Sequence, residues 1–206
     1  MNNSKLNASI EACEYVKATI DTQSIIGVGT GSTVNFFIAE LGKIKNLFKG
    51  AVSSSEASSK LLMDQGIEVF ELNDVNEILL YIDGADEVDE QNRLIKGGGG
   101  ALLQEKIVAS ASDKMIVIAD FDKRVTHLGQ FPLPIEVLGF GLKSSQSQIA
   151  CLLTAQDVAG REITTRMAGD VPFVTDEGNY ILDLHLGKIV DPKKLAIALN
   201  QVPGVV

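Results

Sequence analysis

The sequence has few of the residues that build disulfide frameworks, metal centres or membrane spans. Its 206 residues include two cysteines, two histidines and no tryptophan. Cys13 and Cys151 are far apart, so we expect two core thiols in a reducing cytoplasm and no disulfide. No apolar run is long enough to cross a bilayer, and the first residues do not have the pattern of a signal peptide. These absences predict a cytoplasmic, globular protein with no membrane partner.

Positive charge is also scarce. The chain has 18 lysines and arginines against 27 aspartates and glutamates, for a formal net charge of −9. This excess argues against nucleic acid or an anionic membrane as a partner. It does not exclude a phosphorylated small molecule, because a local cluster of donors can bind an anion against the global charge. His127 and His185 are isolated, which favours structural or surface roles for both.

Strand and helix patterns alternate over the first 120 residues. Short apolar runs, several ending in glycine or aspartate, are typical of buried strands, and the segments between them keep a helical spacing of apolar residues. Strands are expected at 24–29, 50–55, 67–72, 78–83 and 114–120, and helices at 6–16, 34–41, 56–66 and 101–112. Such alternation predicts an α/β fold with a parallel sheet covered by helices.

The pattern changes near residue 130, where two prolines interrupt it. A helix is expected at 144–153, and a second one at 191–200 begins with proline at a favoured position. Between them, the turn at 176–179 separates two alternating runs and indicates a hairpin. Residues from about 130 to the 190s therefore predict a small α+β lobe.

A glycine turn follows the strand at 24–29. Gly27, Gly29 and Gly31 lead into Ser32 and Thr33 at the start of a helix, where we expect one of these two hydroxyls to cap the helix. Backbone N–H groups and the partial positive charge at a helix start suit a phosphate. The spacing fits neither a Walker A loop nor a dinucleotide fingerprint. A tight strand-to-helix turn without a ligand explains the same residues.

The segment 83–105 carries the densest set of reactive groups. Asp83 closes an apolar strand, where active sites of this architecture lie, and Asp86 follows it. The other acids of the segment, Glu87, Asp89 and Glu90, are expected to be solvated. A divalent-metal site is possible here, but the spacing does not match a calcium loop and no histidine is near. We expect no metal and no cofactor.

Lys96 opens a run of four glycines, and Glu105 follows early in the next helix. Four glycines are costly in chain entropy, which favours a close approach of backbone to ligand. Glu105 is three residues after Leu102, at the edge of the apolar face, so its carboxylate could point toward a cleft. A surface pair of Glu105 with Lys106 is the alternative. A carboxylate base beside a lysine that neutralises an oxyanion is the pairing that enolises a sugar.

Several of these motifs together resemble ribose-5-phosphate isomerase, type A. The resemblance spans nearly the whole chain in the same order, over residues 28–33, 53–58, 83–87, 96–107, 118–123, 131–137, 174–179 and 203–205. It implies a Rossmann-like parallel sheet core over residues 1–129 and 199–206, and a ferredoxin-like lid over 130–198. It also implies a homodimer or homotetramer. Gly100, where relatives often have alanine, is expected to be a tolerated departure from the family pattern.

The resemblance further implies a metal-free interconversion of ribose 5-phosphate and ribulose 5-phosphate through a cis-enediolate, in the pentose phosphate pathway. The catalytic residues would be Glu105 as proton acceptor, Asp83 and Asp86 as paired carboxylates, and Lys96. The substrate-binding residues would be Lys5, Thr30, Gly31, Ser32, Thr33, Gly84, Ala85, Gly97, Gly98, Gly99 and Lys123. Two alternatives are a non-catalytic sugar-phosphate sensor, and a deaminase or CoA transferase on the same core.

Overall fold

The chain forms two compact units. The structure, a computed structural model, describes residues 2–206; the first unit comprises residues 2–85 and 101–121, and the second 86–100 and 122–206. The sequence had placed 86–100, 122–129 and 199–206 with the first unit, whereas their contacts group them with the second. A grouping by contacts does not identify which residues act as catalytic core and which as lid, so the boundaries at 129/130 and 198/199 stay a prediction. Within residues 2–206, no helix is long and apolar enough to cross a bilayer.

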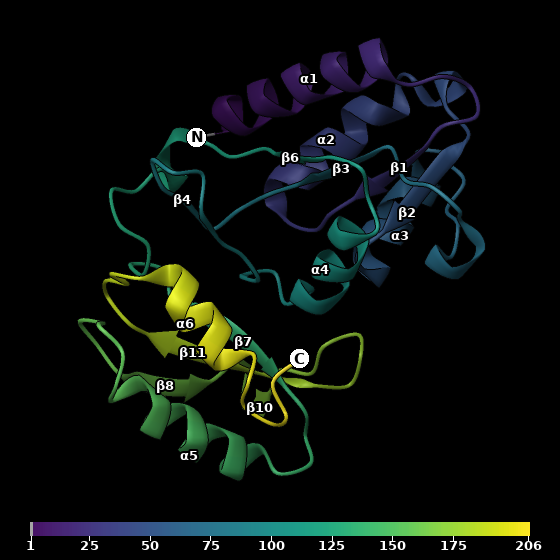
Figure 1. The fold of residues 1–206 in the computed structure, drawn as a ribbon. Coiled ribbons are helices and arrows are strands. Elements are labelled where there is room, and N and C mark those ends of the chain that lie inside the picture. The colour runs from purple at the N-terminus through teal and green to yellow at the C-terminus, as the bar shows by residue number, and fades with distance from the viewer. Residues whose placement is uncertain (1) are drawn as a thin grey trace. The chain divides into compact units, whose positions relative to one another are not determined.

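The first unit is built on a parallel sheet of four strands in the order β2-β1-β3-β6 (Figure 1). This confirms the predicted fold class, because helices separate the strands along the chain. The elements are α1 (Asn2–Thr19), β1 (Ile25–Val28), α2 (Ser32–Gly42), β2 (Gly50–Ser53), α3 (Glu56–Asp64), β3 (Leu80–Asp83), α4 (Leu102–Ser110) and β6 (Met115–Val117).

Alternate residues of the strands point to opposite faces of this sheet and build two apolar layers. Ile26, Leu80 and Ile82 pack with buried residues of α1, α2 and α3 on one face. Tyr81 and Val52 pack with Val108 of α4 on the other. Both faces are covered, which explains why the strands read as continuous apolar runs.

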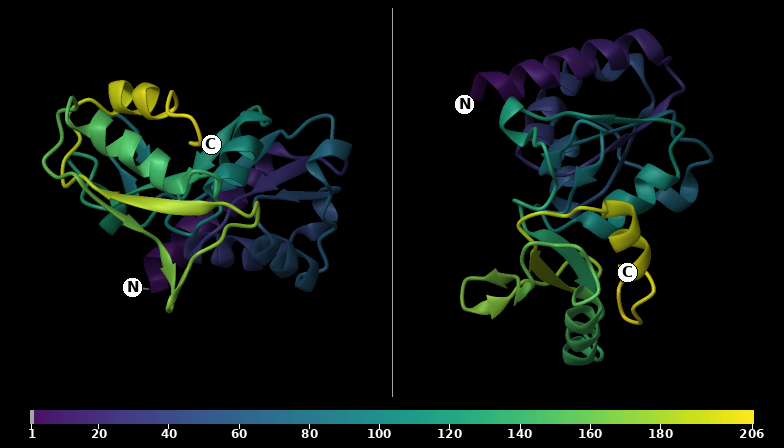
Figure 2. Two further views of the ribbon diagram at one scale, coloured as in Figure 1. Left: turned by 90° about the horizontal axis from the view of Figure 1, so that it is seen from below. Right: turned by 60° about the vertical axis from the view of Figure 1, so that its left-hand side comes forward.

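The second unit has a three-stranded antiparallel sheet in the order β7-β11-β8. Helices α5 and α6 lie on the same face of that sheet (Figure 2) and contribute Ile149, Leu153, Leu195 and Leu199 to its core. The elements are β4 (Glu87–Val88), β5 (Leu94–Ile95), β7 (Leu133–Val137), α5 (Leu142–Leu153), β8 (Glu162–Thr165), β9 (Met167–Ala168), β10 (Val171–Pro172), β11 (Tyr180–His185) and α6 (Pro192–Leu199). Short 3-10 helices occupy Lys45–Leu47, Leu72–Asp74 and Phe121–Lys123.

Two local predictions were wrong, and a third was confirmed only in part. Residues 67–72 form only a single parallel bridge, between Val69 and Ala51, because the chain turns into the 3-10 helix at Leu72–Asp74. The hairpin predicted at the 176–179 turn is present but short: Val174 forms an antiparallel bridge with Tyr180, and the rest of β11 pairs with β7 and β8. Cys151 is exposed on α5, whereas Cys13 is buried as expected.

Candidate active site

Asp83 lies at the point where the strand order of the sheet reverses. β1 has β2 on one side and β3 on the other, and ligands of open parallel sheets bind beyond the strand ends at such a point. The Asp83 side chain is fully buried. Its Oδ1 accepts from the N–H of Gly84 at 2.7 Å and of Thr30 at 3.2 Å, and its Oδ2 accepts from the Tyr81 hydroxyl at 2.6 Å. These donors fix the orientation of the carboxylate.

Tyr81 is a site residue that the sequence reasoning missed. It lies two residues before Asp83 on β3, so both side chains are on the same face of the strand. Burial, followed by the negative charges of Asp83 and Glu105, raises the pKa of the Tyr81 hydroxyl far above its ordinary value. The hydroxyl therefore stays protonated and donates to Asp83. The alternation of an aromatic and an acid at the end of an apolar strand was the available signal.

The glycine turn after β1 exists because the backbone passes close to Asp83. A Cβ at Gly29 would overlap the Asp83 carboxylate, so no larger residue fits there without a shift. Thr30, next in the chain, joins a hydroxyl network with Ser55 at 2.8 Å and Ser58 at 3.3 Å. Ser58 also donates to the carbonyl of Gly29 at 2.8 Å. This network fixes the turn that carries the candidate phosphate-binding residues.

The start of α2 is not capped by a side chain, contrary to expectation. Gly31 is the N-cap, with φ of 129°, and Ser32 is already the first helical residue. Nothing surrounds the position where a Cβ of Gly31 would lie. The Lys5 ammonium group donates to the exposed Ser32 hydroxyl at 2.8 Å, which brings α1 to this helix start. Lys5, Ser32 and the first N–H groups of α2 bring a positive charge and hydrogen-bond donors to this helix start.

Glu105 lies near the start of α4, where its N–H donates to the carbonyl of Ala101. Its side chain is buried, with 3% of its surface exposed. This excludes the surface pair with Lys106. Its negative charge contributes to the raised pKa of Tyr81, so it lies within electrostatic reach of that hydroxyl in the first unit. The positive end of the helix dipole favours a negative charge at this position.

Asp86 and the glycine loop, residues 97–100, belong to the second unit. The N–H of Gly98 donates to Asp86 Oδ2 at 2.8 Å, and a Cβ at Gly98 would overlap that carboxylate. The N–H of Gly100 closes a turn to the carbonyl of Gly97 at 3.0 Å. Lys96 precedes the loop directly after β5 and is partly buried. The structure therefore pairs Asp86 with the glycines, as a backbone-binding carboxylate.

Two acids expected to be solvated are instead buried structural groups. Glu87 accepts from the N–H groups of Gly129 at 2.7 Å and Phe131 at 2.6 Å. Burial of Asp89 opposes its ionisation, but hydrogen bonds from the Arg93 main chain and side chain and from the Gln91 N–H lower its pKa below the ordinary value. Glu90 is exposed as expected.

Gly100 occupies a position with little room for a side chain. Its φ is +84°, and a Cβ would lie 2.6 Å from the ring of Phe173. Alanine at this position is therefore strained in this chain. Lys123, at the end of a 3-10 helix in the second unit, has its ammonium group 5.9 Å from the centre of the Phe131 ring.

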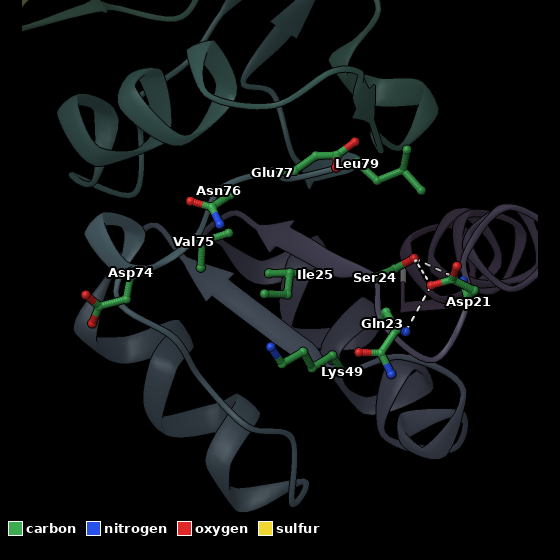
Figure 3. A pocket seen from close by; sticks show the side chains of 10 residues that line it. All are labelled: Asp21, Gln23, Ser24, Ile25, Lys49, Asp74, Val75, Asn76, Glu77 and Leu79. Atoms are coloured by element: carbon green, nitrogen blue, oxygen red, sulfur yellow. Dashed lines mark hydrogen bonds between the residues drawn. The ribbon is translucent and has the colours of Figure 1, made fainter.

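A pocket of about 430 Å³ lies elsewhere on the first unit, at the amino-terminal ends of the strands (Figure 3). Ile25, Val75 and Leu79 form its apolar part, and exposed polar side chains such as Lys49 and Asp74 surround them. No predicted site residue lines this pocket, and Asp83 lies at the other, carboxyl-terminal end of the strands. Within the described residues, no three His, Cys, Asp or Glu side chains gather so that they could hold a metal ion.

Comparison with known proteins agrees with this geometry. The family model of ribose 5-phosphate isomerase A (phosphoriboisomerase A) matches residues 50–206. A ribose-5-phosphate isomerase A from Ruegeria pomeroyi is 52% identical over 184 residues, which cover 88% of this chain and 70% of that protein. One from Ruegeria sp. is 52% identical over 202 residues, covering 97% and 77%.

Solved structures show the same likeness. Ribose 5-phosphate isomerase A from Neisseria gonorrhoeae is 40% identical, with a TM-score of 0.84 over 98% of this chain and 86% of that one. A D-ribose-5-phosphate isomerase in complex with phospho-erythronic acid is 34% identical, with a TM-score of 0.89 over 100% and 88%. The likeness therefore extends over both units of the chain.

Proposed function

The chain belongs to the ribose 5-phosphate isomerase A family, which interconverts ribose 5-phosphate and ribulose 5-phosphate in the pentose phosphate pathway, and we propose how its residues perform this reaction. The sensor, deaminase and CoA-transferase alternatives find no support among its relatives. The reaction moves a proton between two adjacent carbons, so it requires one base, one group that manages the ring oxygen, and donors for a transient oxyanion.

Glu105 is the proposed base. It removes the proton from carbon 2 of the open aldose and returns it to carbon 1, while the proton on oxygen 2 passes to oxygen 1. Its place near a helix start supports this role, because the positive end of the helix dipole favours a negative charge there.

Asp83 is the proposed proton shuttle for ring opening. Its three donors leave it fixed beside the strand ends, where an open parallel sheet binds its ligand. The Tyr81 hydroxyl orients the Asp83 carboxylate by donating a hydrogen bond to it, and it stays protonated during the reaction. The close approach of the Gly29 backbone to this carboxylate explains the glycine at that position.

The phosphate is proposed to bind at the start of α2. The uncapped N–H groups after Gly31, the hydroxyls of Ser32 and Thr33, and the Lys5 ammonium group supply donors and positive charge. Lys123 and the backbone of Thr30 add further contacts, as the family resemblance implies. Binding energy from this remote end of the substrate can be used to position the reacting carbons.

Lys96 and the backbone of Gly97, Gly98 and Gly99 are proposed to stabilise the enediolate. Asp86 supports them by holding the Gly98 N–H, and Ala85 joins this acid to the Asp83 side of the site. A relative has been solved in complex with phospho-erythronic acid, a phosphorylated sugar acid. We also propose a metal-free cytoplasmic enzyme, with no cofactor, that assembles as a homodimer or homotetramer.

The observation that carries this proposal is that two carboxylates, Asp83 and Glu105, are buried and that the negative charges of both act on the Tyr81 hydroxyl. The test incubates the purified protein with ribose 5-phosphate in deuterium oxide and follows products by NMR. We expect ribulose 5-phosphate with deuterium at carbon 1, because the base exchanges with solvent during turnover. Formation of no ketose, or of ammonia or a thioester from the substrates of the rival classes, would overturn the proposal.

A further inference from the structure

Arg166 is a partly buried residue of the second unit that none of the roles above uses. It follows β8, and its main chain is fixed on both sides: its N–H donates to the carbonyl of Ile181 at 2.8 Å, and its carbonyl accepts from Phe173 at 2.9 Å. Its side chain and that of Asp183 on β11 each keep only 16% of their surface exposed. The main chain that carries the guanidinium group is therefore fixed to the antiparallel sheet.

The Arg166 side chain makes two sets of contacts, one with Asp183 and one with the glycine loop. Its Nε and Nη2 donate to the two oxygens of Asp183, at 3.0 and 2.5 Å. Its Nη1 donates to the carbonyls of Gly97 at 2.8 Å and Gly98 at 3.1 Å. The bidentate pair fixes the plane of the guanidinium group, and the remaining nitrogen reaches the glycine loop. A lysine has one charged atom and no fork, so it cannot make this set of bonds.

The glycine loop is thus held through an N–H group and through two carbonyl groups. Asp86 accepts from the Gly98 N–H, and Arg166 donates to the carbonyls on either side of it. Gly97, with φ of 100°, takes a conformation that side chains rarely adopt, so the loop needs such external support to keep one shape. A positive charge on a peptide oxygen also polarises the N–H of the same peptide, which makes it a stronger donor.

We propose that Arg166, held by Asp183, is a positioning residue for the isomerisation. It fixes the glycine loop and polarises the Gly98–Gly99 peptide, so that the N–H of Gly99 and the adjacent Lys96 meet the enediolate in one geometry. This rests on the proposed function, in which the loop stabilises that intermediate. The substrate phosphate is not contacted, so the effect belongs to kcat.

The test compares Arg166→Ala and Arg166→Lys with Arg161→Lys. Arg161 is a matched control, because it also donates to backbone carbonyls of the second unit, those of Leu153 and Gln156, away from the loop. We expect kcat to fall about 100-fold in both Arg166 variants, since small displacements of supporting groups cost this much, with KM changed less than about threefold. Arg161→Lys should keep its kcat. Methylguanidinium should restore part of the kcat of Arg166→Ala.

The outcomes separate the two proposals. Arg166 variants that are less stable but retain wild-type kcat would overturn the positioning role and leave the proposed function standing. A rise in KM with unchanged kcat would also overturn it, since the residue would then act on substrate binding. Should Arg166→Ala fail to fold, the kcat of Arg166→Lys decides alone. A folded wild-type protein without isomerase activity would overturn the proposed function and this inference together.

Discussion

Single residues in this chain acquire their chemistry from the neighbours that hold them. Tyr81, Thr30 and Gly84 fix both oxygens of Asp83, as its proposed role of proton shuttle requires. Tyr81 stays neutral because burial and two nearby carboxylates oppose its ionisation. The same pKa shift links folding to pH and can be measured without substrate.

Tyr81→Phe should flatten the loss of stability at alkaline pH. The folded-state pKa of Tyr81 is raised, so its contribution is complete below the unfolded pKa near 10.0 and declines above it, where only the unfolded chain releases the proton. Above pH 10 the wild-type free energy of unfolding should fall more steeply than that of the variant, by about 1.4 kcal/mol per pH unit. Urea unfolding at several pH values measures both slopes. Equal slopes would show that Tyr81 ionises normally.

Lys123→Ala should mainly raise KM for ribose 5-phosphate. Loss of a charged hydrogen bond to the phosphate costs about 1.5–3 kcal/mol, equivalent to roughly a 10- to 150-fold increase in KM. Steady-state kinetics measures this, with Lys143→Ala, an exposed lysine of α5, as control. An unchanged KM would assign Lys123 to the solvated surface.

At the scale of elements, the strand ends and the glycine loop position the candidate site residues. The parallel strands and the helices between them were predictable, because fully buried apolar runs have few other interpretations. The residues 67–72 were not, since their apolar content is that of a strand but they lie at the sheet edge, where one bridge satisfies them. Glu87 and Asp89 were misjudged because their backbone N–H partners come from a turn and from a distant segment.

Gly100→Ala should destabilise the protein and lower kcat. Alanine at φ of +84° is strained by about 1–3 kcal/mol, and its Cβ must displace the Phe173 ring. Gly169→Ala is the matched control, because Gly169 also has positive φ but an open surrounding. Thermal unfolding should show a larger loss for Gly100→Ala, and kinetics a loss of kcat in that variant alone. Equal losses of stability would mean that Phe173 moves aside freely.

At the scale of the whole molecule, the candidate residues are shared between two units. Asp83, Glu105 and the α2 start belong to the first, and Asp86, Lys96 and Lys123 to the second. The sequence motifs identified these residues because they are contiguous in the chain. Which unit each one joins depends on long-range packing, and so does the support from Arg166, 68 residues from Gly98. Neither was available from the sequence.

The enzyme should work without a divalent metal. Lysine and backbone donors are proposed to neutralise the enediolate, which leaves no step for a Lewis acid. After exhaustive dialysis against EDTA, the initial rate of ketose formation should match that of untreated protein. A loss of activity that magnesium or manganese restores would contradict the proposed mechanism.

The most direct test is the turnover number of Glu105→Gln. Glutamine keeps the shape of the side chain and removes its basicity, so kcat should fall about 10²–10⁴-fold with little change in KM. Glu90→Gln, at an exposed acid of the same segment, should keep wild-type kinetics. Circular dichroism and thermal unfolding establish that both variants fold. A folded Glu105→Gln protein with near-normal kcat would contradict the assignment of the base and make Asp83 the next candidate.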